Sequence, residues 1–311
     1  MFIRHDVDVL EAPGVGLYPR TDAQAQPATD VGRLLLRCPD RPGLVAAVST
    51  FLTQAGANIV SLQQHATQQS GGTFMQRTIF HLPGLSSARQ AFERDLTEQL
   101  ATRFDMDFRL TEAANPKKVV IMASRADHCL LDLLWRHRRG ELDMTITAVI
   151  SNHPDLADHV RPFGVPFHHI PAAKDSRDEA ERRQLELLRD NVDLVVLARY
   201  MQIITPQFLA EVGCPLINIH HSFLPSFIGA EPYRRAKERG VKLVGATAHY
   251  VTEELDDGPI IEQDVVRVDH RHDVDDLTRL GADVERAVLS RAVLWHCQDR
   301  IIQHGNQTIV F

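Results

Sequence analysis

Three polar residues in the second half of the chain have the chemistry needed to transfer or hydrolyse an acyl group without a metal. Asn218-Ile219-His220 places an amide two positions before an imidazole, and Asp256-Asp257-Gly258 supplies a carboxylate further on. If residues 216–220 form a strand, side-chain alternation directs Asn218 and His220 to one face. An amide N–H and a protonated imidazole can stabilise the oxyanion of a tetrahedral intermediate, and a carboxylate can orient water. This pattern predicts metal-free acyl chemistry.

The acidic pair leaves two candidates for the carboxylate. Asp256 and Asp257 precede a glycine and a proline, which is also the pattern of an ordinary acidic turn. On the residues alone, Asp256 and Asp257 both stay candidates for the carboxylate. A histidine at a strand end is usually structural, and we expect this of His221, which alternation turns away from Asn218. His220 differs because it shares a face with that amide.

Composition limits the classes of function. A chain of 311 residues with 44% hydrophobic residues suits two globular domains, and a net charge of -7 argues against nucleic acid as the main partner. Four cysteines without CxxC spacing favour a reducing compartment. The sequence contains neither a secretory signal nor an apolar run of about 18 residues. We therefore expect a cytoplasmic enzyme without contact to a membrane.

No pattern predicts a cofactor. The remaining histidines, such as His168-His169 and His270 with His272, lack the spacing of metal ligands near cysteines or carboxylates. Neither G-x-x-x-x-G-K-[ST] nor G-x-G-x-x-G occurs to hold a nucleotide. We expect no metal and no cofactor.

The pattern of elements changes near residue 114 and predicts two α/β domains. Upstream, strands are expected near 33–38, 58–65, 73–81 and 105–111, with helices over 44–54 and about 86–102. This βαββαβ order is ferredoxin-like. We expect an N-terminal extension over 1–30, the first domain over 31–113, a linker over 114–117 and a second domain over 118–311.

In the second domain, strands and helices alternate. Short apolar strands are expected near 118–123, 144–150, 167–170, 194–197 and 216–220, helices over about 127–138 and 178–190, then strands near 243–250 and 260–268 and a helix over about 275–298. This rhythm predicts a Rossmann-like, mostly parallel, doubly wound sheet with its cleft at the carboxyl ends of the strands. Asn218 and His220 fall at such an end.

Longer strings carry a family resemblance. The second domain resembles the folate-dependent formyltransferase fold, whose members share Asn-x-His, a Leu-Pro-x-x-x-Gly turn and a later Asp-x-Gly segment. NIHHSFLPSFIGAEPY and VGATAHYVTEELDDGPIIEQ are similar to the formyltetrahydrofolate deformylases in particular. DRPGLVAAVSTFLTQAGANI resembles an ACT module, which such deformylases carry in front. Together the two resemblances span nearly everything after residue 30.

The resemblance implies hydrolysis of 10-formyltetrahydrofolate to tetrahydrofolate and formate, with water as the formyl acceptor. Such an enzyme supplies formate for purine biosynthesis and balances one-carbon pools. The implied catalytic residues are Asn218, His220 and Asp256. The implied lining of the substrate pocket is Arg199, Tyr200, Met201, Leu224, Pro225 and Gly229. In the ACT module a small amino-acid effector would bind at Asp40, Gly43 and Asn58, and paired modules would make the protein a homo-oligomer.

Three alternatives remain open. A glycinamide ribonucleotide formyltransferase would use an amine acceptor, but Met122-Ala123-Ser124-Arg125-Ala126-Asp127-His128 lacks the glycines expected of its phosphate loop. A methionyl-tRNA formyltransferase would need a basic carboxy-terminal domain, and the sequence contains none. An amino-acid-sensing regulatory protein without activity is disfavoured by the presence of all three site residues.

Overall fold

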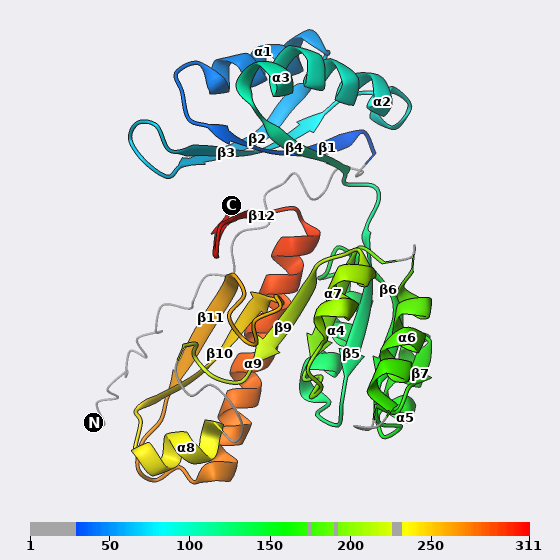
Figure 1. Ribbon diagram of the computed structural model, residues 1–311, viewed down its shortest axis with the longest axis vertical. Coiled ribbons are helices and arrows are strands. Elements are labelled where there is room, and N and C mark those ends of the chain that lie inside the picture. The colour runs from blue at the N-terminus through cyan, green and yellow to red at the C-terminus, as the bar shows by residue number, and fades with distance from the viewer. Residues whose placement is uncertain (1–28, 173–175, 190–191, 226–231) are drawn as a thin grey trace, which may run out of the picture.

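The computed structural model describes residues 29–172, 176–189, 192–225 and 232–311. A four-stranded sheet, a seven-stranded sheet and a two-stranded hairpin organise these residues (Figure 1).

The N-terminal sheet is antiparallel, with the strand order β2-β3-β1-β4. Its strands are β1 (Val31–Pro39), β2 (Asn58–Ala66), β3 (Thr73–His81) and β4 (Asp107–Glu112). Helices α1 (Leu44–Gln54), α2 (Leu85–Leu96) and α3 (Thr102–Phe104) cover one face, and a π-helical turn over Thr97–Ala101 joins the last two. Leu34, Val48, Phe80 and Phe92 lie in the core between the sheet and the helices, which confirms the predicted ferredoxin-like plan.

The larger sheet follows the order β11-β10-β9-β8-β5-β6-β7. Its strands are β5 (Lys117–Ala123), β6 (Met144–Ser151), β7 (Phe167–His169), β8 (Leu194–Ala198), β9 (Leu216–His220), β10 (Leu243–Tyr250) and β11 (Ile260–Arg267). The pairs from β9 to β7 are parallel, whereas β10 and β11 are antiparallel additions. The predicted mostly parallel sheet is therefore confirmed.

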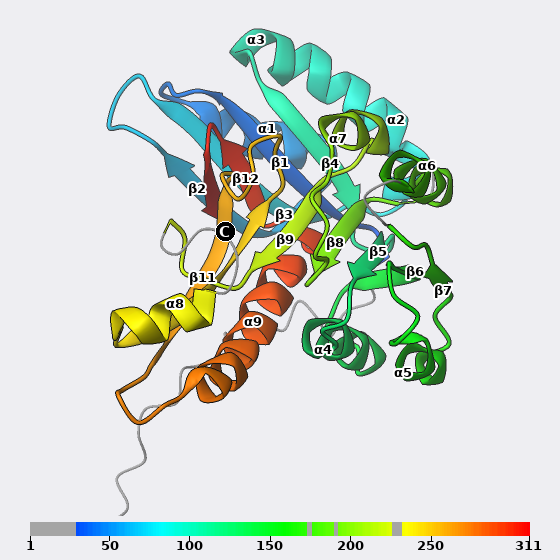
Figure 2. The same ribbon diagram turned by 60° about the horizontal axis from the view of Figure 1, so that its bottom comes forward.

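Helices cover both faces of this sheet (Figure 2). One core holds apolar residues of α4 (His128–Arg138) and α9 (Val274–Cys297), and a second core on the other face holds those of α6 (Arg177–Leu188) and α7 (Pro206–Val212). The long helix α9 begins with a capping box between Asp273 and Asp276. The apolar residues along one side of α9 then pack against the sheet.

Several short elements were not predicted. They are α5 (Ala157–Val160), the 3-10 turn Arg161–Phe163, α7, α8 (Pro232–Arg239), β12 (Ile301–His304) and β13 (Gln307–Val310). Among the described residues, no helix has the length and apolar character needed to cross a membrane.

The C-terminal segment after α9 lies next to the first sheet (Figure 1), and apolar residues of the two are buried against each other. Leu35 and Met75 of the first sheet pack against Ile302 and Phe311 of the C-terminal hairpin segment. The side chain of Asp299 is fully buried there. It accepts hydrogen bonds from Lys117 Nζ at 2.8 Å and Thr111 Oγ1 at 2.7 Å, and two arginines of the first sheet, Arg33 and Arg109, lie within 3.6 and 3.3 Å.

Candidate active site

Asn218 and His220 stand at the carboxyl end of β9. This strand pairs in parallel with β8, where Leu197 is opposite Asn218, and antiparallel with β10, where His249 is opposite Asn218. The two polar side chains interrupt a strand that is otherwise Leu, Ile and Ile, so they face a site rather than the main core. The geometry expected from the alternation is present.

A loop after β10 brings Asp256 to His220. Its Oδ2 lies 3.2 Å from His220 Nδ1, and the two side chains are 11% and 6% exposed. Burial alone would raise the pKa of Asp256, but the hydrogen bond from His220 and the charges of the neighbouring histidines outweigh it and lower that pKa. Asp256 is therefore the ionised partner of the imidazole, whereas Asp257 is exposed.

The approach of this loop depends on a glycine. A Cβ on Gly258 would lie 1.8 Å from the carbonyl oxygen of Tyr250, so only glycine fits against β10. Asp256 itself has a φ of 57°, in the left-handed region that aspartate tolerates better than most residues. The Asp-Asp-Gly string thus supplies both the carboxylate and the glycine that lets the loop pack closely against β10.

His249 orients the amide of Asn218. Its Nδ1 lies 2.9 Å from the carbonyl oxygen of Tyr250, which assigns the proton to Nδ1 and leaves Nε2 as an acceptor. Asn218 Nδ2 then donates to that Nε2 at 3.2 Å. Burial lowers the pKa of His249 despite the bond to Tyr250 and the charge of Asp256, so the ring is neutral near pH 7. One N–H of Asn218 is fixed on His249, and its other N–H makes no hydrogen bond within the described residues.

The ring nitrogen of His220 that does not contact Asp256 is Nε2. Nε2 is buried and has no hydrogen-bond partner in the described part of the chain. A buried nitrogen of this kind is costly unless something pairs with it. Asn218, His220 and Asp256 consequently form one connected group with donors facing the end of β9.

The other residues expected at the substrate pocket occupy different environments. Tyr200 is buried and its hydroxyl accepts from Gln184 Nε2 at 2.9 Å, whereas Met201 is 59% exposed. Leu224 is buried, and its backbone N–H donates to Thr247 Oγ1 at 3.0 Å. Pro225 is exposed, and Gly229 lies outside the described residues.

Arg199 points its guanidinium toward a second polar cluster. Its Nε lies 3.5 Å from Oε2 of Glu285, a side chain that is 2% exposed on α9. The same carboxylate accepts from the Tyr233 hydroxyl at 2.6 Å and pairs with His128 Nε2 at 2.8 Å. We call Arg199, Glu285, Tyr233 and His128 the Glu285 cluster. Burial and the Arg199 charge lower the pKa of His221, which adjoins this cluster, to about 4.

His128, Cys129 and Glu285 also come close enough to be considered as metal ligands. Both oxygens of Glu285 already accept hydrogen bonds, and the Arg199 cation stands beside them. Burial raises the pKa of Cys129 well above its ordinary value, so its thiol is protonated. These features suit an arginine-carboxylate cluster better than a cation site.

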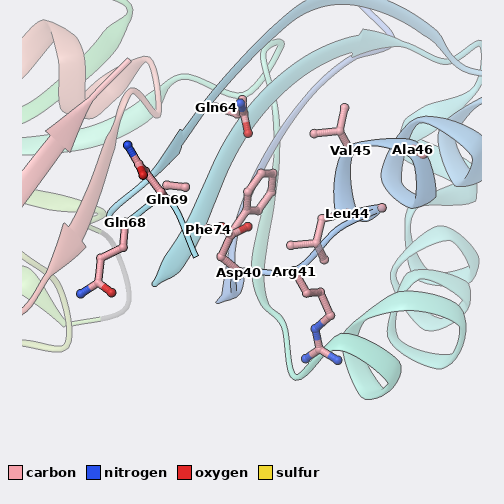
Figure 3. A pocket seen from close by; sticks show the side chains of 11 residues that line it. Asp40, Arg41, Leu44, Val45, Ala46, Gln64, Gln68, Gln69 and Phe74 are labelled. Atoms are coloured by element: carbon pink, nitrogen blue, oxygen red, sulfur yellow. The ribbon is translucent and has the colours of Figure 1, made fainter. Parts of the chain in front are cut away.

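The three residues predicted to bind an effector do not all line the same pocket. Asp40 and Gly43 line a pocket of about 490 Å³ between the turn after β1 and strand β2 (Figure 3). Arg41, Gln64, Gln68 and Phe74 also line it. Asn58 is exposed at the start of β2 and does not belong to this lining.

Sequence reasoning missed His249 and Glu285. A signal for His249 existed, because a histidine in the strand paired with Asn218 can face it, but the register between β9 and β10 was unknown. Glu285 lies at helical spacing on the stripe of α9 that contains Gly281 and Val288, and this spacing was the signal that could have marked it as buried.

Comparison with known proteins agrees with this geometry. A family model described as formyl transferase matches residues 117–293, and one described as ACT domain matches residues 32–94. The fold and site thus define a formyltransferase-type enzyme with an ACT module. The formyltetrahydrofolate deformylase of Mycobacterium tuberculosis is 71% identical over 294 residues, covering 94% of this chain and 95% of the relative. The chain belongs to the formyltetrahydrofolate deformylases, as the sequence predicted.

Solved structures of relatives match different shares of the chain. A formyltetrahydrofolate deformylase from Pseudomonas syringae pv. tomato superposes with a TM-score of 0.85 and 48% identity, covering 90% of this chain and 94% of that one. The glycinamide ribonucleotide transformylase 1 of Symbiobacterium toebii superposes with a TM-score of 0.60 and 32% identity, over 63% of this chain and 94% of that one. That second enzyme therefore matches only part of the present chain.

Proposed function

We propose that this chain hydrolyses 10-formyltetrahydrofolate to tetrahydrofolate and formate, with Asn218, His220 and Asp256 as the catalytic residues. The observation that carries this proposal is the buried His220–Asp256 pair, whose Nε2 has no partner within the described residues, two positions after Asn218 on the same strand. The 71% identical deformylase supports the choice of substrate.

In the proposed reaction, water adds to the formyl carbon and negative charge develops on the formyl oxygen. Asn218 Nδ2 and His220 Nε2 donate to that oxygen, and each such donor is worth roughly 10²- to 10³-fold in rate. Asp256 stays ionised, because its pKa is lowered, so it stabilises protonated His220 and can accept a proton from the attacking water. Collapse of the intermediate breaks the bond to N10, and N10 takes up the proton that Asp256 accepted from water as formate leaves.

Product analysis tests directly whether water or an amine accepts the formyl group. The pure protein is incubated with 10-formyltetrahydrofolate, with and without glycinamide ribonucleotide, and the products are separated. We expect formate and tetrahydrofolate in equal amounts in both reactions. Formylated glycinamide ribonucleotide as the main product would instead identify a formyltransferase, like the Symbiobacterium toebii enzyme that superposes on part of this chain.

We propose that the residues divide into an extension over 1–30, an ACT domain over 31–113, a linker over 114–117 and a catalytic domain over 118–311. The pocket at Asp40 and Gly43 is proposed to bind a small amino acid, because it offers a carboxylate for an amino group and the Arg41 cation for a carboxylate. Titration calorimetry with glycine and methionine tests this. Heat with the wild type that disappears in Asp40→Ala supports the site, and no heat with either amino acid rejects it.

Three further parts of the proposal concern cellular context. The formate released would serve purine biosynthesis and balance one-carbon pools. The four cysteines of the chain are free thiols, which supports a cytoplasmic location. The ACT module is proposed to make the protein a homo-oligomer, which light scattering on the full chain measures.

A further inference from the structure

The last residues of the chain lie against the loop that carries Asp256. We call residues 296–311, which comprise the end of α9 and the hairpin of β12 and β13, the C-terminal clamp. The formyl transferase match ends at residue 293 and the ACT match at residue 94, so the clamp belongs to neither matched range. It is nevertheless in contact with both domains.

The hairpin of the clamp holds the tip of the Asp256 loop. Asn306 Nδ2 donates to the backbone carbonyl of Asp257 at 3.0 Å, one residue after the carboxylate proposed as catalytic. Two positions later, Thr308 Oγ1 donates to the backbone carbonyl of Ile260 at 2.7 Å, where β11 begins. Both bonds reach main-chain atoms, so they fix the course of the loop itself.

The other end of the loop is held by the last turn of α9. The Tyr250 hydroxyl lies 2.8 Å from Nδ1 of His296, and both side chains are buried. The backbone carbonyl of Tyr250 lies 2.9 Å from His249 Nδ1, and Gly258 packs closely against the same carbonyl. The clamp therefore contacts the loop at its start as well as at its tip.

The clamp is anchored on the N-terminal sheet. Ile302 and Phe311 pack against Leu35 and Met75 in a small buried cluster. Arg37 Nη1 of β1 also donates to a backbone carbonyl of β12 at 3.2 Å. A support that is already ordered loses little conformational entropy when it holds a partner. The hairpin therefore meets the Asp256 loop as a fixed support.

Local packing gives the tip of the loop little support. Leu255 is 60% exposed and Asp257 is also exposed, so neither side chain ties the loop to the core. Asp256 has a φ of 57°, a conformation that a residue other than glycine keeps only when its surroundings hold it. The hydrogen bond from Asn306 is such a restraint.

From these contacts, and resting on the proposed function, we infer that the clamp positions Asp256 for catalysis, with Asn306 as the main positioning residue and Thr308 as a second. Asp256 Oδ2 lies 3.2 Å from His220 Nδ1, so a small displacement of the loop breaks the contact. Misplacement by about 1 Å costs about 10²-fold in rate. The clamp prevents this displacement by holding the backbone on the carboxyl side of Asp256.

Steady-state hydrolysis of 10-formyltetrahydrofolate by the full chain tests the inference. Asn306→Ala removes one hydrogen bond to the loop, and we expect kcat to fall about three- to tenfold, the factor that corresponds to one such bond. KM should stay within about twofold, because Asn306 acts on the carboxylate and not on the folate. Thr308→Val keeps the shape of the side chain and should lower kcat about two- to fivefold. Gln307→Ala changes the exposed neighbour and is the matched control, with kcat within about 1.5-fold of the wild type.

A double-substitution cycle separates positioning of Asp256 from a general effect on the structure. In Asp256→Asn the carboxylate is absent, so the further change Asn306→Ala should alter the remaining rate by less than about 1.5-fold. A merely structural role would lower the rate by the same factor in both backgrounds. Thermal melting shows which variants fold.

The outcomes are distinct. Wild-type kcat in a folded Asn306→Ala protein would overturn the inference, and so would an equal loss in the two backgrounds. If Asn306→Ala does not fold, or if Asp256→Asn is too slow to measure, Thr308→Val decides: a lowered kcat at constant KM supports the inference, and an unchanged kcat overturns it. A wild-type protein that releases no formate would instead reject the proposed function, which stands if only the clamp variants behave unexpectedly.

Discussion

The clearest test of the catalytic proposal is a pair of substitutions in adjacent residues. Asp256→Asn removes a charge 3.2 Å from His220 Nδ1 and keeps the shape of the side chain. Two unit charges at that distance interact by about 5 kcal/mol at an effective dielectric constant of about 20, which sets the scale of the loss that the variant can suffer. Asp257→Asn removes an equal charge from the neighbouring exposed position.

We expect kcat of Asp256→Asn to fall roughly 10²- to 10⁴-fold, because the amide neither stabilises protonated His220 nor accepts a proton from water. Its KM should change by only a few-fold. Asp257→Asn should stay within about twofold of the wild type, because substitutions of exposed residues away from a site are usually near neutral. Formate release is followed by a coupled dehydrogenase assay, with thermal melting to show that both proteins fold.

Two results would refute the reasoning. Near wild-type turnover in Asp256→Asn would remove the carboxylate from the mechanism. An equal loss in both variants would show that the net charge of the loop matters rather than the contact with His220.

Three other predictions follow from the geometry. Gly258→Ala should lower kcat about 10²-fold or more, because the added carbon displaces the loop that carries Asp256 and misplacement of about 1 Å has that effect; an active variant would show that the loop adapts. His249→Ala should lower kcat while secondary structure by circular dichroism is unchanged, since the free amide loses its orientation; unchanged kcat would exclude His249 from the site. Asp299→Asn should reduce the free energy of unfolding by about 3 to 5 kcal/mol at pH 7, measured in urea.

The loss of unfolding free energy caused by Asp299→Asn should depend on pH. Burial raises the pKa of Asp299, but the charge and hydrogen bond of Lys117, with further help from Arg109 and Thr111, lower it overall. A lowered pKa stabilises the fold above the ordinary carboxyl range, and this stabilisation is lost as the pH falls through the native value. The difference between wild type and Asp299→Asn should therefore be largest near neutrality and shrink below about pH 4. A constant difference would contradict this.

The fold was predictable because both domains have strong local periodicity. Buried strands such as Leu194–Ala198 are continuous apolar runs, and the order of elements then limits the topology. The short helix Pro206–Val212 was missed although Thr205 caps it, because seven residues give too little periodicity to stand out.

The candidate site was only partly predictable. Asn218 and His220 are two positions apart on one strand, so alternation alone relates them. The contacts of Asn218 with His249 and of Arg199 with Glu285 cross 31 and 86 positions of the chain, respectively, and depend on strand register and helix docking. No local pattern contains that information.

The contacts of Asp299 couple the unfolding of the two sheets. Its carboxylate belongs to the segment after α9, yet three of its partners, Arg33, Arg109 and Thr111, come from the N-terminal sheet. Ile302 and Phe311 likewise lose their apolar cover if that sheet departs. Deleting residues 29–116 would consequently leave Asp299 with Lys117 but without these three partners, and would expose an apolar strip to water. We therefore expect the whole chain to melt as one cooperative unit.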